Sequence, residues 1–248
     1  MFKIKLNWLK SLLEDLVGLI YPNVCQFCEK EIATAREGYV CKRCKNDIKY
    51  IEPPFCEQCG KPFGGSITVK FICTDCKISK IYFDRARSAV GYEGIIKKAV
   101  HLYKYKSALW IEPMLAEILT TTMQKDLNPT DWDSIIPVPL HFAKYNERGF
   151  NQAERLSNHI SKITKIPMNK KVLKRVKYTE TQTTLDRTKR SENVKNAFIV
   201  KDKTGWLKGK KIILVDDVMT TGATVNECAR MLRRAGVAKI DVWTFARG

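Results

Sequence analysis

Eight of the nine cysteines in this 248-residue chain occur as four C-x-x-C pairs in the first third of the sequence. The pairs are Cys25 with Cys28, Cys41 with Cys44, Cys56 with Cys59, and Cys73 with Cys76. Two thiolates at this spacing can hold one side of a tetrahedral ion, and a second pair about a dozen residues on completes four sulfur ligands. The pattern therefore predicts two bound Zn²⁺ ions.

Two ways of grouping the cysteines around the ions fit the sequence. In the simpler one the first four cysteines hold one ion and the last four hold the other, but an interleaved grouping also fits the spacing. Disulfides are disfavoured because they belong to exported chains, and no signal peptide with an uncharged core is expected here. Four sulfur ligands leave no open coordination position, so we expect structural rather than catalytic zinc.

The first 20 residues predict an amphipathic helix. Apolar side chains recur at helical spacing, and the charged residues Lys5, Lys10, Glu14 and Asp15 interrupt them. A membrane-spanning helix needs about 20 largely uncharged residues, so no transmembrane segment is expected. The helix is predicted either to dock on its own protein or to contact a partner or a membrane surface. We accordingly expect a cytoplasmic protein, with peripheral contact at the inner face of the membrane as the alternative.

The net charge of +18 is distributed unevenly. Residues 1–84 contain 13 Lys and Arg against 10 Asp and Glu, whereas residues 140–211 contain 19 against 6. Such an excess attracts an anionic partner, although a lysine-rich solvated face has the same composition. We expect any nucleic acid or phosphorylated ligand to be drawn to this basic segment.

From residue 85 onward, short apolar runs alternate with helical patterns. The runs at 87–92, 134–140, 210–216 and 239–246 have the length of strands, and helical spacing covers 93–106, 111–123, 151–164 and 224–236. This alternation predicts an α/β fold, in which helices flank a parallel sheet with right-handed crossovers. We therefore divide the chain into an N-terminal helix (1–20), a zinc module (21–84) and an α/β domain (85–248).

A candidate ligand site follows the strand that is predicted to end at Val215. Asp216 and Asp217 come next, ahead of a hydroxyl-rich loop and a helix, which is where ligands bind in such sheets. Backbone N–H groups and hydroxyls of this loop can hold a phosphate at the helix N-terminus. Two carboxylates would repel that phosphate, so we expect them to face sugar hydroxyls with a divalent cation nearby. The stretch predicts recognition of a phosphorylated sugar.

The segment IILVDDVMTTGAT resembles the signature of type I phosphoribosyltransferases, which bind phosphoribosyl pyrophosphate (PRPP). The resemblance implies that Asp216 and Asp217 contact the ribose, with Mg²⁺ accompanying PRPP. It also implies a 5-phosphate loop made of Met219, Thr220, Thr221, Gly222, Ala223 and Thr224. The segment is not a P-loop, since it lacks the Gly-Lys-Ser/Thr ending.

Other segments narrow this resemblance. They include the block ERGFNQAE within IIPVPLHFAKYNERGFNQAERLS, the stretch TETQTTLDRTKRSENVKNAFIV and the final KIDVWTFARG. Together with the cysteine pairs, they are similar to the ComF family of competence proteins over nearly the whole chain. The resemblance implies a double zinc ribbon ahead of a type I phosphoribosyltransferase-like domain. It further implies a role in natural transformation, with PRPP, single-stranded DNA and a DNA-import helicase or inner-membrane channel protein as partners.

The resemblance also assigns residues around the ligand. Lys104, Tyr105 and Lys106 lie where the family has its pyrophosphate loop, although Ser107 stands where family members often have glycine. Arg148 is expected to contact pyrophosphate or a DNA phosphate, with a surface salt bridge as the alternative. A polar stretch is predicted to cover the ligand, and it contains Gln182, Arg187, Arg190 and Asn193.

Two functions remain open from the sequence. One is a binding protein that holds PRPP while a basic surface tracks single-stranded DNA. Its candidate DNA contacts are Arg148, Lys174, Arg175 and Lys177, with Tyr145, Phe150 and Tyr178 as stacking platforms. The alternative is a catalytically active phosphoribosyltransferase of nucleotide metabolism or salvage, which would displace pyrophosphate from PRPP. No acceptor site or catalytic residue can be identified, so turnover stays an open question here.

Overall fold

The computed structural model describes residues 24–34, 38–65, 69–178 and 192–248. These belong to two compact units, Met1–Asp47 and Ile48–Gly248. The predicted N-terminal helix and the predicted ligand-covering residues Gln182, Arg187 and Arg190 lie outside the described residues. Within the described ranges, the helices are all too short or too polar to cross a membrane.

The first unit is organised around its four cysteines. Its helix α2 (Lys42–Asn46) begins after Cys41, whose sulfur accepts a hydrogen bond from the backbone N–H of Cys44 at 3.4 Å. A hydrogen bond of 2.7 Å from the Cys25 N–H to the Glu31 carbonyl closes the turn around the first pair. Such tight turns bring cysteines two residues apart to the same side of the backbone, as the zinc pattern requires.

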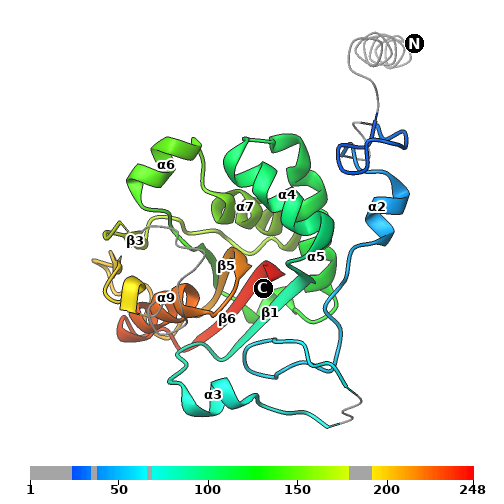
Figure 1. The fold of residues 1–248 in the computed structure, drawn as a ribbon. Coiled ribbons are helices and arrows are strands. Elements are labelled where there is room, and N and C mark those ends of the chain that lie inside the picture. Colours follow the sequence, from blue (N-terminus) through cyan, green and yellow to red (C-terminus); the bar gives the residue numbers. More distant parts are fainter. Residues whose placement is uncertain (1–23, 35–37, 66–68, 179–191) are drawn as a thin grey trace, which may run out of the picture. The chain divides into compact units, whose positions relative to one another are not determined.

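The second unit contains a parallel sheet of four strands, in the order β1-β6-β5-β2 (Figure 1). The strands are β1 (Arg85–Gly91), β2 (Ser134–Pro137), β5 (Lys211–Met219) and β6 (Lys239–Arg247). The two central strands are buried over most of their length, which explains their nearly continuous apolar runs. The predicted α/β fold with a parallel sheet is confirmed.

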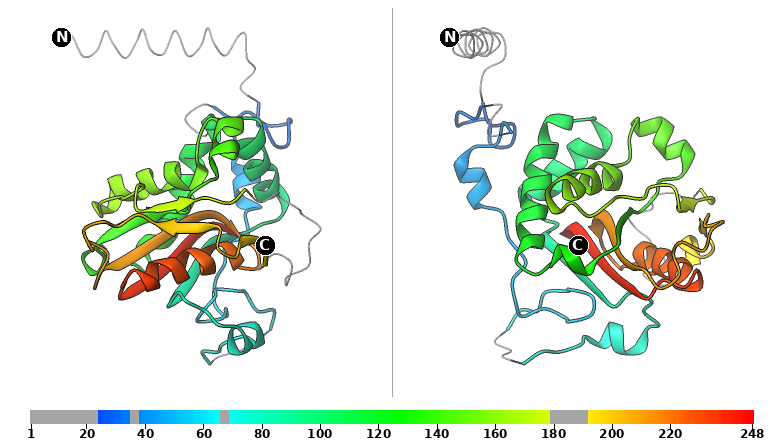
Figure 2. Two further views of the ribbon diagram at one scale, coloured as in Figure 1. Left: turned by 90° about the vertical axis from the view of Figure 1, so that its left-hand side faces the viewer. Right: turned by 180° about the vertical axis from the view of Figure 1, so that it is seen from behind.

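Helices cover both faces of this sheet (Figure 2). One face carries α4 (Gly94–Tyr105), α5 (Glu112–Gln124) and α7 (Gln152–Thr164), and the other carries α9 (Ala223–Arg234). The four helices predicted for the α/β domain are all present. Asn151 caps α7 as expected, because its Oδ1 accepts a hydrogen bond of 3.1 Å from the Ala153 N–H. Gly236, with φ of +89°, follows the end of α9.

The structure contains several short elements that the sequence pattern did not predict. They are helices α3 (Thr74–Ile78) and α6 (Phe142–Arg148), the 3₁₀ turns η2 (Leu109–Ile111) and η3 (Pro129–Asp131), and an antiparallel pair, β3 (Leu173–Arg175) with β4 (Phe198–Val200). Elements of three to seven residues contain too few repeats for periodicity to reveal them.

Strand β5 is also longer than predicted. We expected it to end at Val215, but it continues through both aspartates to Met219. The reason is its pairing with β6, which extends to the Met219–Arg247 pair, whereas its pairing with β2 stops at Pro137 opposite Val215. The acidic pair is therefore part of a hydrogen-bonded strand.

The second cysteine group packs into the α/β domain. Cys56, Cys59 and Cys76 share one hydrophobic core with residues of the sheet and of α9. Gly60 makes this packing possible, because a Cβ at its position would lie 2.5 Å from the Ala86 carbonyl oxygen. The predicted domain boundaries stay a prediction, but this group is structurally continuous with the sheet.

A buried carboxylate joins α4, α5 and α7 on the face of the sheet opposite α9. Glu112, which is 5% exposed at the start of α5, accepts hydrogen bonds from Tyr103 of α4 at 2.9 Å and from His159 of α7 at 2.8 Å. It also pairs with Arg155 of α7. Burial alone would raise the pKa of Glu112, but the bonds from Arg155 and His159 lower it below its usual value.

We expect Glu112→Gln to lower the free energy of unfolding by about 2 kcal/mol at neutral pH, because it removes the charge that these hydrogen bonds stabilise. Because the pKa of Glu112 is lowered by folding, this stabilisation is complete above the unfolded value of about 4.3 and is lost as the pH falls below it. Urea denaturation from pH 7 to pH 3 measures both effects. The exposed Glu117→Gln in the same helix is the control, and a variant difference that does not shrink in acid would contradict this role.

Candidate functional site

The structure groups the cysteines sequentially. The four sulfur atoms of each group lie within 4.8 Å of one another, in the sets Cys25, Cys28, Cys41, Cys44 and Cys56, Cys59, Cys73, Cys76. The distances of 3.7 Å between Cys25 and Cys44 and 3.8 Å between Cys59 and Cys73 are those of a tetrahedron with Zn–S bonds of about 2.3 Å. Two four-sulfur zinc sites therefore fit the chain, without interleaving.

Backbone N–H groups donate hydrogen bonds to a cysteine sulfur of the second group. The sulfur of Cys56 accepts N–H hydrogen bonds from Cys59 at 3.5 Å and from Cys73 at 3.3 Å. Although burial opposes the charge, these bonds lower the pKa of Cys56 to about 7. These bonds therefore favour the thiolate form of Cys56, which is the form that zinc binds, whereas burial raises the pKa of Cys59 and Cys76 in the same group.

The structure predicts that the two zinc sites can be emptied separately. Replacing Cys25 and Cys28 by serine should reduce the bound zinc from about two ions per chain to about one, because each four-sulfur set is complete in itself. Metal analysis of the purified variant, together with native mass spectrometry, measures the content. Loss of both ions from this variant would contradict the sequential grouping.

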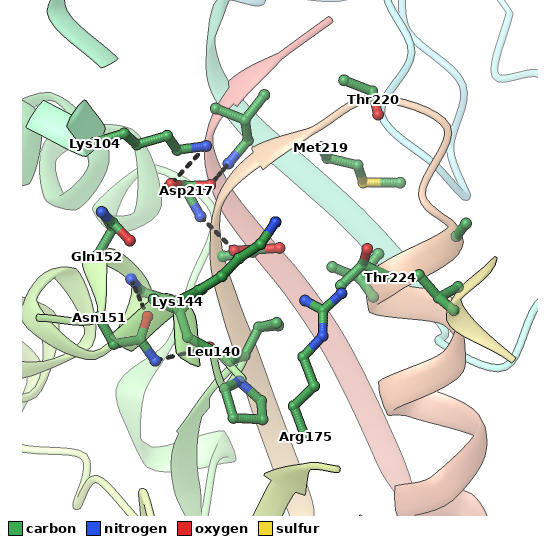
Figure 3. A pocket seen from close by; sticks show the side chains of 18 of the residues that line it. Lys104, Leu140, Lys144, Asn151, Gln152, Arg175, Asp217, Met219, Thr220 and Thr224 are labelled. Carbon is green, nitrogen blue, oxygen red and sulfur yellow. Dashed lines mark hydrogen bonds and ion pairs between the residues drawn. The ribbon is translucent and has the colours of Figure 1, made fainter. Parts of the chain in front are cut away.

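A cavity of about 500 Å³ lies at the carboxyl end of β5 (Figure 3). Its wall combines residues from β5, the following loop, α4, α6, α7 and β3. The predicted residues that line it are Asp216, Asp217, Met219, Thr220, Thr221, Gly222, Ala223, Thr224, Lys104, Tyr105, Arg148, Arg175 and Asn193. The fold thus brings together segments that are more than 100 residues apart in the sequence.

The cavity exists because β2 leaves the sheet before β5 ends. The last contact between them is the hydrogen bond of 2.8 Å from the Val138 N–H to the Val215 carbonyl. Beyond this point the chain of β2 turns away through Pro139 and Leu140, which line the cavity. Asp216 and Asp217 consequently face the crevice from a strand that β6 still holds.

The two aspartates have different surroundings. Asp217 forms an ion pair of 2.8 Å with Lys104 of α4, and this contact raises the pKa of the lysine although burial opposes it. The pKa of Asp216 is raised to about 7, first by burial and then by the neighbouring charge of Asp217. The charge of Asp216 also raises the pKa of Lys104, so the lysine is influenced by both carboxylates, although the ion pair is with Asp217.

The loop after the aspartates has the form expected for a phosphate site. Gly222 is buried and adopts a left-handed φ of +80° immediately before α9. A Cβ at Gly222 would meet the flexible end of the Met219 side chain at 2.7 Å, so it is the left-handed conformation rather than the space that favours glycine here. The N-terminus of α9 opens into the cavity, where its N–H groups and dipole favour an anion.

Five cationic side chains line the same cavity: Lys97, Lys104, Lys144, Arg148 and Arg175. Burial lowers the pKa of Lys144, and the charges of Arg175 and Arg148 lower it further. Arg148 donates a hydrogen bond of 3.2 Å to Gln152 and stacks 5.2 Å from the centre of the Tyr105 ring. Cations held this close together indicate an anionic ligand with more than one charge.

Lys144 and Gln152 are among the lining residues that were assigned no role in ligand binding from the sequence. Lys144 belongs to the short helix α6, which the sequence pattern did not reveal. Gln152 is 1% exposed, and its Nε2 has no hydrogen-bond partner among the described residues. Both residues lie in the block KYNERGFNQ, which could have drawn attention to them as a unit.

Other predicted residues lie outside the cavity. Lys106 is exposed at the end of α4, and Lys174 and Lys177 are exposed on either side of Arg175, whose side chain reaches the cavity (Figure 3). The proposed stacking role of Phe150 is wrong, because this ring is 9% exposed and packs 5.2 Å from that of Tyr103.

Ser107 occupies a position where the family resemblance led us to expect glycine. It has a left-handed φ of +49°, the conformation that glycine adopts without strain. The turn after α4 therefore keeps this backbone form despite the side chain.

Comparison with known proteins agrees with this architecture. Residues 16–77 match the family model of the double zinc ribbon domain, and residues 143–248 match that of the phosphoribosyl transferase domain. The chain is 33% identical over 227 residues to Competence protein F of Haemophilus influenzae, covering 90% of this chain and 96% of that protein. It is 30% identical over 232 residues to DNA utilization protein YhgH of Salmonella typhi, covering 92% and 99%.

A third relative is Competence protein ComFC of Bacillus subtilis, which is 26% identical to this chain over 251 residues. The alignment covers 93% of this chain and 97% of that protein. The similarity thus extends through both the cysteine groups and the α/β domain, in the same order. On these grounds the chain belongs to the ComF family of competence proteins.

Proposed function

We propose that the cavity at the end of β5 binds PRPP together with Mg²⁺, and that the protein uses this ligand while handling single-stranded DNA during its uptake. The observation that carries the proposal is the joining, in one cavity, of an acidic pair and a glycine-containing loop at a helix N-terminus. A sugar phosphate needs both kinds of group, because its hydroxyls donate to carboxylates while its phosphate accepts from N–H groups.

The charges of the cavity support each part of this ligand. The loop from Met219 to Thr224 suits the 5-phosphate, and Asp216 and Asp217 suit the ribose hydroxyls. Lys104 and Arg148 lie on the α4 and α6 side, where they can neutralise a pyrophosphate. The carboxylates also provide the oxygen ligands that Mg²⁺ prefers, and the ion would supply further positive charge to the pyrophosphate.

We expect Asp216→Asn combined with Asp217→Asn to weaken PRPP binding at least about 100-fold. Two charge-assisted hydrogen bonds are lost, each contributing about 1.5–3 kcal/mol, while the shape of the side chains is kept. Calorimetry with PRPP and MgCl₂ measures the change. The exposed Asp131→Asn is the control, and unchanged or tighter binding in the double variant would contradict the assignment.

Contact with DNA is supported by the relatives' names and by an exposed surface near the cavity. Lys174 and Lys177 are exposed, and Tyr178, which follows Lys177 in the chain, is 48% exposed. Two aromatic side chains of α6 are exposed as well, Phe142 at 70% and Tyr145 at 46%. The ring of Tyr178 lies 5.4 Å from that of His141, which caps α6. Cations beside exposed aromatic rings suit the phosphates and bases of a single strand.

Replacing Lys174 and Lys177 by alanine should weaken binding of single-stranded DNA. Loss of two phosphate contacts should lower the slope of log K against log salt by about 1.4. Fluorescence anisotropy of an oligonucleotide from 50 to 300 mM NaCl measures this slope. The double variant of the exposed Lys125→Ala with Lys239→Ala is the matched control. An equal effect in both double variants would contradict a specific contact, because it would show that DNA is attracted only by the overall positive charge.

Turnover of PRPP is a second candidate function, favoured by the match to the phosphoribosyl transferase domain. Release of pyrophosphate in the presence of nucleobases or amines would establish a transferase. Binding of PRPP without release under all of these conditions would instead support a protein that uses PRPP as a ligand.

The proposal also includes a further partner, which is an import helicase or an inner-membrane channel protein. It includes a peripheral position at the membrane as well.

A further inference from the structure

The loop that is proposed to hold the 5-phosphate has two sides. One side lines the ligand cavity, and the other lines a second cavity of about 330 Å³. The opposite wall of this second cavity comes from the second cysteine group and the chain that follows it, including Cys59, Cys76, Ser79, Lys80 and Ile81. The second zinc site therefore lies directly behind the loop.

The start of the loop is tied to this zinc site through the last strand. Arg247 ends β6 opposite Met219 of β5, and its Nη2 donates a hydrogen bond to the sulfur of Cys59 at 3.9 Å. The next residue, Gly248, donates its N–H to the Met219 carbonyl at 3.0 Å. A zinc ligand is thus one side chain away from the strand that carries the loop.

The end of the loop is tied to the same region through α9. Asn226, in the first turn of α9, accepts a hydrogen bond of 2.8 Å from the Tyr82 N–H and donates one of 2.9 Å to the Lys80 carbonyl. Arg233, further along α9, donates to the Tyr82 carbonyl at 3.0 Å. The segment of residues 80–82 comes a few residues after Cys76, so it is anchored by the metal site on one side and by the sheet on the other.

These contacts depend on a module that has little structure of its own. Apart from the five-residue helix α3, its described residues form turns and isolated bridges. A bound metal ion stabilises such turns through its binding free energy, and here it adds to the packing of Cys56, Cys59 and Cys76 in the core that contains α9. Loss of zinc would therefore release both supports of the loop together.

We infer that the second zinc site is a positioning element for the phosphate loop, so that occupancy of this site by zinc sets the affinity for the phosphorylated ligand. Arg247 transmits the effect and is a positioning residue, since it lines the second cavity and not the ligand cavity. The first zinc site belongs to the other compact unit and is not predicted to have this role. The inference rests on the proposed binding of PRPP at the loop.

The two cysteine groups provide a matched pair of variants. Cys56→Ser with Cys59→Ser should lose one zinc ion and weaken PRPP binding at least about 10-fold in calorimetry, because the loop loses its support. Cys25→Ser with Cys28→Ser should also lose one zinc ion but keep the wild-type affinity. Equal affinities in both variants, whether reduced or not, would overturn the inference.

A milder variant tests the same link if the serine variant does not fold. Arg247→Met keeps most of the side-chain volume and both zinc ions, but removes the donor to Cys59. It should weaken PRPP binding several-fold and increase amide hydrogen exchange in residues 219–224, and Arg247→Lys should partly restore both. The exposed Arg234→Met is the control, and an Arg247→Met protein with unchanged affinity and unchanged exchange would overturn the role of Arg247.

The hydrogen-exchange measurement separates this inference from the proposed function. If the wild-type protein did not bind PRPP, the proposed function would fail. Faster exchange of the loop in Arg247→Met but not in Arg234→Met would still show that Arg247 supports it, because that measurement needs no ligand.

Discussion

The hydrogen bonds between β5 and β6 are the interaction on which the rest of the structure depends. They continue to the Met219–Arg247 pair, several residues beyond the point where β2 leaves the sheet. This difference in length creates the cavity and at the same time holds its acidic floor in a regular strand. A site built on a strand is more rigid than one built on a loop, which suits a ligand recognised by many polar contacts.

The cavity contains charges of both signs in close contact. Lys104 neutralises Asp217 in an ion pair. The pKa of Asp216 is raised by burial and by the neighbouring charge of Asp217. Lys144, Arg148 and Arg175 add positive charge that the acidic pair offsets in part. Such a balance is unfavourable for a structural core, because buried charges cost free energy unless they are paired. A multiply charged ligand with hydroxyl groups would satisfy both sets.

The two cysteine groups look equivalent in the sequence but differ in their surroundings. The second group contributes three buried cysteines to the core that contains α9, and Cys59 accepts a hydrogen bond from Arg247 of β6, which pairs with the end of β5 just before the glycine-containing loop. Its metal site therefore supports the α/β domain as well as its own turns. Closed four-sulfur sites have no chemistry to offer a substrate, so their influence on function must pass through such packing.

The sequence by itself determined the zinc ligands, the parallel α/β fold and the position of the acidic pair and loop, because each depends on local spacing or periodicity. It did not reveal the length of β5, the burial of Phe150 or the convergence of Lys144, Gln152 and Arg175 on the cavity. These features were decided by the tertiary structure. They depend on which strands are neighbours and where one of them stops, and those contacts join residues far apart in the chain, which local spacing cannot encode.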